Sequence, residues 1–151
     1  MELIQSNGRP RYGRFDQIPS KINLDDYRYK TPYGKVLTGW RKQLKYKKFK
    51  FCGLQHKQYS IGVAIVDLSW AGHGFYYVYD HLSEKVVEWN ATQPLGLKTQ
   101  LDEQPLFSQS YFKKSGYEFE MQHANGVRYI QVTKKGQIQL KAQIACEGTE
   151  P

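Results

Sequence analysis

The hydrophobic pattern of residues 59–80, YSIGVAIVDLSWAGHGFYYVYD, predicts two β-strands joined by a Gly-rich turn centred on Ala71-Gly72. Successive side chains of a strand point to opposite faces. One face of the first strand is therefore formed by Tyr59, Ile61, Val63, Ile65 and Asp67, and the other by Ser60, Gly62, Ala64, Val66 and Leu68. The first row is bulky and predicts a packed face. The second row is smaller and predicts a face that another layer, a backbone or a bound molecule approaches closely.

The last third of the chain predicts a three-stranded antiparallel meander. Asn125-Gly126 is a strong two-residue hairpin signal, and Lys134-Lys135-Gly136 fits a three-residue hairpin. Together they predict the cross-strand pairs Met121–Ile130, Phe119–Val132, Val132–Ile138 and Ile130–Leu140. Both turns place apolar residues on one face, whereas a slip of one residue would turn these side chains to water.

Shorter patterns complete an all-β prediction. A strand-like pattern begins at Leu44 and needs a bulge near Lys47 and Lys48, another strand covers residues 85–90, and residues 113–116 predict a further hairpin. Residues 1–39 are rich in Gly, Pro, Arg and Tyr and predict an extended N-terminal segment before a β domain at 40–151. The total is about seven or eight antiparallel strands, which favours a barrel or a strongly curved sandwich.

Composition indicates the size of this domain, the distribution of its charge and its expected location in the cell. The chain has 151 residues, enough for one domain with a substantial core, and its net charge is +8. Residues 1–70 hold 14 Lys or Arg against 5 acidic residues, so the basicity belongs to the N-terminal half. The first twenty residues lack the apolar region of a secretory signal, and no apolar run is long enough to span a membrane. We therefore expect a cytoplasmic protein in which Cys52 and Cys146 are thiols.

The aromatic, glycine and aspartate positions resemble those of a known family. They are Trp40-Arg41, Tyr46, Phe49, Phe51, residues 61–68, Trp70-Ala71-Gly72 and residues 75–80. This pattern resembles the N-terminal half of the family known as domain of unknown function 2804. Members of that family are about twice as long, so the resemblance implies half of a two-domain architecture. The family is in turn distantly similar to lipocalin-like proteins of the carotenoid hydratase type, which implies a calycin-like barrel with an apolar interior.

Two acidic residues and one histidine are candidates for chemistry. With a turn centred on Ala71-Gly72, Asp67 and Asp80 would lie roughly 13 Å apart at about 3.3 Å per residue. That distance is too long for a glycosidase-type pair, and Asp80 is better explained as an Asx-turn residue. Asp67 and His73 could form a general acid–base pair. The alternative, which we favour, is that Asp67 caps the turn and His73 is a solvated loop residue.

Metal and nucleotide chemistry has little support in the sequence. The four histidines are widely spread and the two cysteines show no zinc-site spacing. The Gly-rich run Ala71-Gly72-His73-Gly74 lacks the lysine and the helix of a phosphate-binding loop. We therefore expect no metal and no cofactor.

A basic run at residues 41–50, RKQLKYKKFK, has two interpretations. It contains Arg41, Lys42, Lys45, Lys47, Lys48 and Lys50, interleaved with aromatic residues. Such a composition could bind single-stranded nucleic acid through backbone contacts and stacking. Lysines also protect exposed strand edges, and we favour that interpretation. A third use is to orient the anionic head group of a ligand.

The remaining aromatic residues suggest a ligand pocket. We predict that it is lined by Trp40, Trp70, Tyr77, Tyr79 and Trp89, although such stripes are more often plain core. The preferred function is a β module that binds an apolar or amphipathic small molecule, or that docks a second β domain or a copy of itself. The alternatives are a lyase or isomerase acting on such a ligand through Asp67 and His73, and a basic single-strand nucleic-acid binder.

Overall fold

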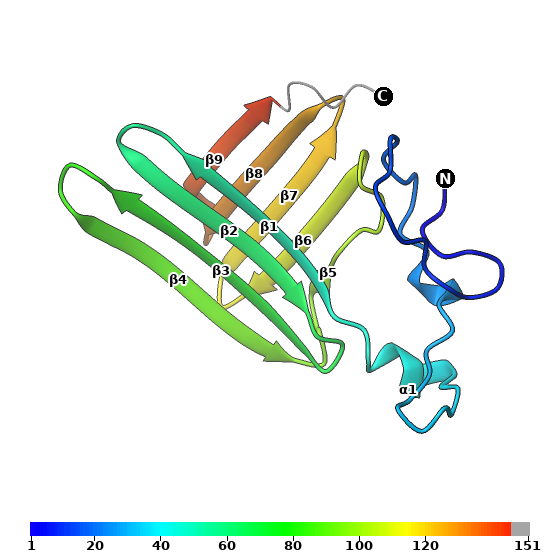
Figure 1. Ribbon diagram of the computed structural model, residues 1–151. Coiled ribbons are helices and arrows are strands. Elements are labelled where there is room, and N and C mark those ends of the chain that lie inside the picture. Colours follow the sequence, from blue (N-terminus) through cyan, green and yellow to red (C-terminus); the bar gives the residue numbers. More distant parts are fainter. Residues whose placement is uncertain (146–151) are drawn as a thin grey trace.

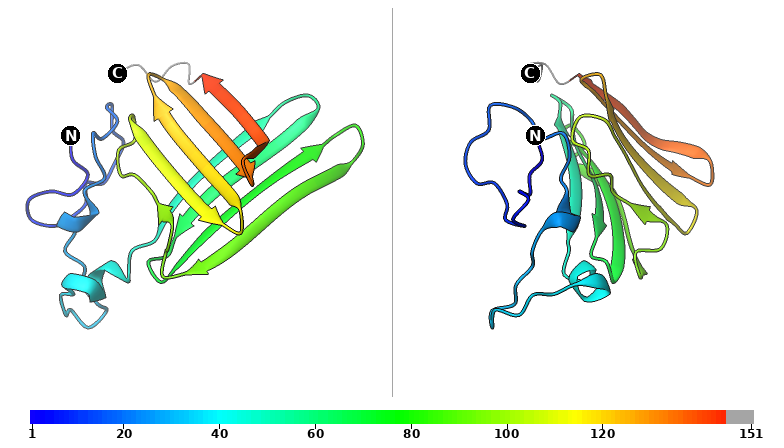
Figure 2. Two further views of the ribbon diagram at one scale, coloured as in Figure 1. Left: turned by 180° about the vertical axis from the view of Figure 1, so that it is seen from behind. Right: turned by 90° about the vertical axis from the view of Figure 1, so that its right-hand side faces the viewer.

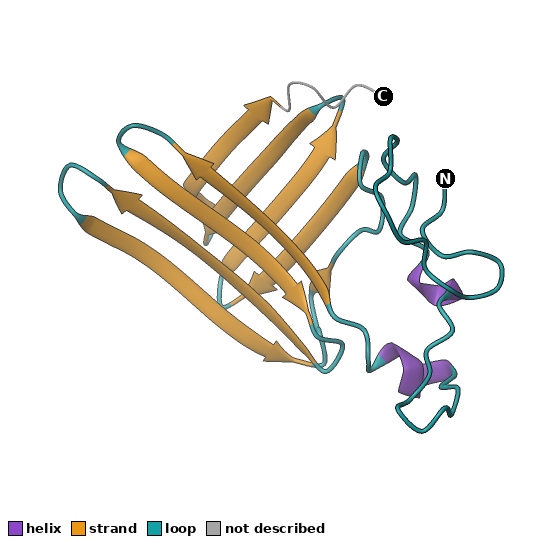
Figure 3. Ribbon diagram, viewed as in Figure 1, coloured by secondary structure: helices purple, strands orange, loops and turns teal. Residues whose placement is uncertain are grey.

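The computed structural model describes residues 1–145, and nearly all of its regular structure is β-strand (Figure 3). Two antiparallel sheets contain the strands, and the strand order within each sheet follows the sequence (Figure 1). The first sheet consists of β1 (Lys48–Gln55), β2 (Tyr59–Asp67), β3 (Ala71–Asp80) and β4 (Lys85–Pro94). The second consists of β5 (Thr99–Gln100), β6 (Ser108–Lys114), β7 (Tyr117–Ala124), β8 (Val127–Lys134) and β9 (Gln137–Ala145). The predicted all-β antiparallel architecture is confirmed, with nine strands in place of seven or eight.

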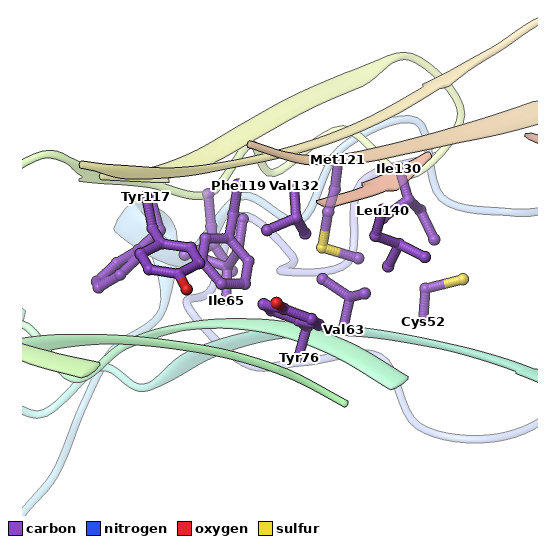
Figure 4. Packing of buried hydrophobic residues seen from close by; sticks show 12 residues of the cluster. Cys52, Val63, Ile65, Tyr76, Tyr117, Phe119, Met121, Ile130, Val132 and Leu140 are labelled. Atoms are coloured by element: carbon purple, nitrogen blue, oxygen red, sulfur yellow. The ribbon is translucent and has the colours of Figure 1, made fainter. Parts of the chain in front are cut away.

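The two sheets lie as two layers, with the core between them (Figure 2). Figure 4 shows side chains from both layers pointing toward one another. The core is formed by Cys52, Val63, Ile65, Tyr76, Leu101, Phe112, Tyr117, Phe119, Met121, Ile130, Val132 and Leu140. The bulky row of β2 faces this core, as its pattern predicts. Its small row lies on the outer face, where the ring of Tyr77 covers Gly62 so closely that an added Cβ would lie 2.3 Å from Cε1.

The turn between β2 and β3 lies earlier than predicted. It comprises Leu68, Ser69 and Trp70, so that Asp67 pairs with Gly72. Gly72 and Gly74 therefore belong to the strand itself and lie on its core face, where β5 and β6 approach. An added Cβ would lie 2.1 Å from Thr99 Oγ1 at Gly72 and 2.4 Å from Phe112 Cδ1 at Gly74. The glycine-rich pattern thus marks the close approach of the two sheets rather than a turn.

Three tight hairpins connect β6 through β9. Their turn residues, Ser115-Gly116, Asn125-Gly126 and Lys135-Gly136, all have positive φ, as type I′ turns require. The predicted pairs Met121–Ile130 and Phe119–Val132 are confirmed, and so is a hairpin within residues 113–116.

The predicted register between β8 and β9 is wrong. The last loop has two residues, and an irregularity at Val132/Thr133 shifts the pairing further along β9. As a result Val132 pairs with Leu140, and Ile130 pairs with Ala142. Ile138 pairs instead with Thr133 and is exposed. The shorter loop and the bulge each move the pairing by one residue, so together they move it by two and keep an apolar row on the core face.

Three other predicted boundaries change. Residues 39–43 form a short helix, α1 (Gly39–Gln43), so the strand predicted from Leu44 begins only at Lys48. β4 extends beyond residue 90 to Pro94, and the short strand β5 lies where the sequence pattern indicated no strand.

The N-terminal segment is irregular apart from η1 (Leu24–Asp26) and α1, and lies beside the sheets (Figure 2). It is organised around Asn23, which is buried: its Oδ1 accepts the Ile4 N–H at 2.8 Å, and its Nδ2 donates to the Ile4 carbonyl at 3.0 Å. The Ile22 N–H donates to the Glu103 carbonyl, and the Tyr46 hydroxyl donates to the Leu24 carbonyl. These hydrogen bonds attach the segment to the β domain.

Among residues 1–145, neither helix has the length and apolar character that crossing a bilayer demands.

Candidate functional site

A cavity of about 220 Å³ opens between the edge strand β1 and strands β6, β7 and β8 of the facing sheet. It is lined by Phe49, Lys50, Phe51, Cys52, Pro105, Ser108, Met121, Gln122, His123, Arg128, Tyr129 and Ile130. The lining combines apolar core residues with basic and polar groups. This combination of an apolar wall with a few polar groups is typical of small-molecule sites.

Lys50 provides the inner basic group of the cavity. It pairs with Ile65 of β2, a core residue, and its side chain therefore points between the sheets. Its Nζ donates to Ser108 Oγ at 2.8 Å and to Ser110 Oγ at 3.0 Å. Both hydroxyls belong to β6, so this ammonium bridges the two sheets.

Burial lowers the pKa of the Lys50 ammonium below its usual value of 10.5. The Asp102 carboxylate opposes this effect, and the positive charge of Arg128 adds to it. The surroundings of Lys50 therefore disfavour its charged form on balance. An additional negative charge in the cavity would favour the charged form of Lys50.

The lowered pKa predicts a pH-dependent contribution of Lys50 to stability. The unfolded chain binds more protons than the folded chain between the folded pKa and 10.5, so stability rises with pH in that window. We expect the free energy of unfolding of the wild type to increase, relative to Lys50→Met, as the pH rises toward 10.5. Urea denaturation of both proteins at several alkaline pH values measures this difference. A difference that falls or stays constant would contradict it.

His123 contributes a buried nitrogen to the cavity wall. Its Nδ1 lies 2.7 Å from the Pro105 carbonyl oxygen, which can only accept, so Nδ1 carries a proton. Its Nε2 is buried and has no hydrogen-bond partner among the described residues. His123 also pairs directly with Arg128 across β7 and β8, which places a second basic group beside it. Buried polar atoms are rarely left without a partner, so Nε2 is suited to meet a polar group of a ligand.

The apolar wall of the cavity is continuous with the core. Figure 4 shows Cys52 from one sheet and Met121 and Ile130 from the other toward the same end of the cluster. All three side chains are at least nine-tenths buried. A ligand with its polar group at Lys50 could therefore extend an apolar part toward these residues.

The structure does not bring Asp67 and His73 together. Asp67 lies on the core face of β2, and its Oδ1 accepts the Ser69 N–H at 2.7 Å. Asp67 therefore caps the turn, as the favoured alternative predicted. His73 pairs with Val66 on the outer face, and its Nδ1 lies 2.8 Å from Thr92 Oγ1. The two side chains thus leave opposite faces of the sheet.

Asp80 has the role of an Asx-turn residue, as predicted. Its Oδ1 accepts the Leu82 N–H at 3.0 Å, and its Oδ2 accepts from the Ser83 hydroxyl at 3.0 Å. The Leu82 hydrogen bond is the main reason that the pKa of Asp80 is lowered. Asp67 and Asp80 lie at opposite ends of the hairpin, since Asp67 pairs with Gly72 and Asp80 with Tyr59.

The five aromatic residues predicted to line one pocket lie in three separate places. Trp89 packs against the core and stacks on Tyr117 with ring centroids 4.1 Å apart. Trp40 on α1 and Trp70 in the β2–β3 turn are exposed, at 66% and 56%. Tyr77 and Tyr79 lie on the outer face of the first sheet. None of the five lines the cavity beside Lys50.

The outer face of the first sheet carries exposed apolar side chains on both of its edge strands. Phe49 and Phe51 stack there with ring centroids 6.3 Å apart and are 63% and 44% exposed. Val86 of β4 is also exposed on this face. Exposed apolar side chains are a feature of docking surfaces, and the docking of a second β domain or a second copy stays a prediction.

The basic run at residues 41–50 is divided among several internal contacts. Lys42 donates to the Asp25 carbonyl, Lys47 to the Leu68 carbonyl, and Lys48 forms an ion pair with Glu103 at 2.8 Å. Lys48 and Lys50 both point to the core side of β1. Arg41 lies over the ring of Trp40, so the run does not present its charges on one continuous surface. This arrangement does not favour nucleic-acid binding.

No three His, Cys, Asp or Glu side chains of residues 1–145 gather closely enough to hold a metal ion. Cys52 lies in the core, whereas Cys146 is outside the described residues.

Comparison with known families decides the relationship of the chain. The family model described as "Domain of unknown function (DUF2804)" matches residues 1–150. The chain belongs to this family. The resemblance in the aromatic, glycine and aspartate pattern is thereby confirmed for the DUF2804 family. No curated protein and no solved structure matches the chain.

Most residues of the cavity beside Lys50 were not predicted from the sequence. Lys50 was identified only as part of the basic run, while Ser108, His123 and Arg128 were not identified. One signal was present: alternation along β7 puts His123 on the same face as Met121 and Phe119, and a histidine in an apolar row is unusual. That Lys50 of β1 lines the same cavity could not be predicted, because nothing local in the sequence shows how the two sheets meet.

Proposed function

We propose that the protein binds an amphipathic small molecule in the cavity between β1 and β6–β8. The single observation that supports this most strongly is the placement of Lys50, whose ammonium points inward and contacts the hydroxyls of Ser108, which lines the cavity, and Ser110. A lysine facing the core costs stability unless its charge is compensated. A bound ligand with a polar end at Lys50 and an apolar end at Met121 would compensate that cost.

We also propose that the two sheets form a calycin-like arrangement opened along its sides. In an up-and-down barrel, each strand pairs with its neighbours in sequence, and strand order in both sheets here follows the same rule. The apolar interior with a basic opening beside β1 supports this interpretation. The proposed ligand would then occupy the interior near the open edge of the arrangement.

The size of the cavity limits the ligand. Pockets for drug-sized molecules have volumes of roughly 300–1,000 Å³. At about 220 Å³ this cavity is smaller, which favours a compact ligand such as an eight-carbon chain over a large ring system.

Methionine methyl groups provide a specific test. The chain contains two methionines, Met1 in the N-terminal segment and Met121 in the cavity wall. In protein labelled with ¹³C-methyl methionine, we expect octyl ligands, namely octanoate, 1-octanol and octylamine, to shift the Met121 resonance in a saturable manner. The Met1 resonance should stay unchanged and serves as the internal control.

An unchanged Met121 resonance would contradict the proposal. If none of the three octyl ligands moves the Met121 resonance, the proposed binding function is wrong. Equal shifts of both resonances would indicate non-specific association.

A further inference from the structure

We infer that the ligand of this cavity carries a carboxylate, held by Lys50 inside the cavity and by Arg128 at its mouth. This inference rests on the proposed binding function and names the chemical class of its ligand. It follows from the balance of charges around the cavity, from the position of each basic group, and from the unpartnered nitrogen of His123.

The basic groups of the cavity have no close acidic partner. Among residues 1–145, the ion pairs join Lys48 to Glu103 and Lys113 to Glu118, and neither includes Lys50 or Arg128. The lining itself contains no aspartate or glutamate. Two positive charges close enough to affect each other therefore lie at one opening, which attracts an anion.

The acid that raises the pKa of Lys50, Asp102, accepts hydrogen bonds from the backbone. Asp102 acts on Lys50 through its charge, but its Oδ1 accepts the Gln104 N–H at 2.9 Å and its Oδ2 lies 3.4 Å from the Gln109 nitrogen. Asp102 thus orders the loop before β6 and compensates Lys50 only from a distance. A ligand carboxylate could form the direct contact that Asp102 does not form.

The depth of the two basic groups matches an amphipathic anion. Lys50 is partly buried between the sheets, whereas Arg128 is exposed at the rim. A carboxylate entering the cavity would meet the planar guanidinium of Arg128 first and the Lys50 ammonium further in. Its hydrocarbon chain would then lie against Met121, Ile130 and Cys52.

The buried Nε2 of His123 supports a polar end at the same place. His123 lies directly opposite Arg128, so a carboxylate at Arg128 would be near this ring. Nε2 has no hydrogen-bond partner among the described residues, so a polar end of the ligand at this place would give it one. An alcohol or a hydrocarbon offers no comparable charge to Lys50 and Arg128.

Comparison of octanoate with 1-octanol and octylamine tests the inference, using the Met121 methyl titration. The three ligands share one hydrocarbon chain and differ in the charge of the head group. We expect octanoate to bind about 10- to 100-fold more tightly than 1-octanol, the range for hydrogen bonds to charged groups. Octylamine should bind most weakly, because Lys50 and Arg128 repel it.

Variants identify the groups responsible. Lys50→Met should reduce the affinity for octanoate about 10- to 100-fold while leaving that for 1-octanol within about threefold. Arg128 is exposed at the rim, so Arg128→Gln should fold like the wild type. It should lower the affinity for octanoate, but not for 1-octanol, by a smaller factor than Lys50→Met does. Lys57→Met, in the exposed turn of the same β1–β2 hairpin, is the matched control and should bind octanoate like the wild type.

The possible failures are distinct. Equal affinity of the wild type for octanoate and 1-octanol overturns the carboxylate inference and leaves the binding function intact. The inference is also overturned if Lys50→Met and Arg128→Gln reduce the affinities for octanoate and 1-octanol equally. Absence of any Met121 shift with all three ligands overturns the binding function itself.

Discussion

Phe119→Ala is expected to lower the free energy of unfolding by about 3–5 kcal/mol, as truncation of a fully buried aromatic residue does. Phe119 is fully buried, and its ring centroid lies 5.9 Å from that of Tyr76, 5.3 Å from Trp89 and 5.8 Å from Phe112. It therefore joins the two sheets, and the remaining side chains cannot fill its volume. Urea denaturation followed by circular dichroism measures the loss.

The exposed Phe107 provides the control for this truncation. It is 58% exposed, so Phe107→Ala should change the free energy of unfolding by no more than about 0.5 kcal/mol. Similar losses in both variants would show that Phe119 does not hold the sheets together.

Gly74→Ala is expected to be the most disruptive small substitution, with a cost of about 3 kcal/mol at the upper end of the range for overpacking. The added Cβ would lie 2.4 Å from Cδ1 of Phe112, whose ring is fully buried and cannot move aside. The sheets would have to separate locally. Thermal and urea unfolding of the purified variant measure the effect.

Two further variants show whether the sheet contact is the cause. At Gly53, on the outer face of β1, an added Cβ would lie 3.0 Å from the exposed ring of Phe51 and 3.9 Å from the Ile61 carbonyl oxygen, which is an ordinary contact. Gly53→Ala should therefore be nearly neutral. Adding Phe112→Leu to Gly74→Ala should cost less than the two separate losses together, because the second change creates room for the first. Additive losses would contradict this explanation.

The local features of the fold could be predicted from the sequence. The Asn125-Gly126 turn determines the pairing of Met121 with Ile130, because a two-residue turn leaves only one register. The bulge at Val132/Thr133 could not be predicted in this way. It arises within the strand and has no turn signal. Moving the pairing by two residues preserves the apolar pattern, so the sequence alone does not distinguish Leu140 from Ile138 as the partner of Val132.

The candidate site was largely beyond prediction for a different reason. The pair of Asp67 and His73 was proposed because the two residues are close in sequence, yet strand alternation separates them. The cavity instead joins Lys50 to Ser108 and His123, which come from the other sheet and are distant in the chain. Hairpin signals describe neighbours in sequence and contain no information on how one sheet lies over another.

The sequential strand order has a consequence for synthesis on the ribosome. The first sheet is complete once Pro94 has been made, whereas every strand of its partner layer comes later. During that interval Val63, Ile65 and Tyr76 have nothing to pack against, and the growing chain carries an uncovered apolar surface. Lys48 and Lys50 point from the edge strand to this same side, so the nascent intermediate is protected by positive charge until its covering layer emerges.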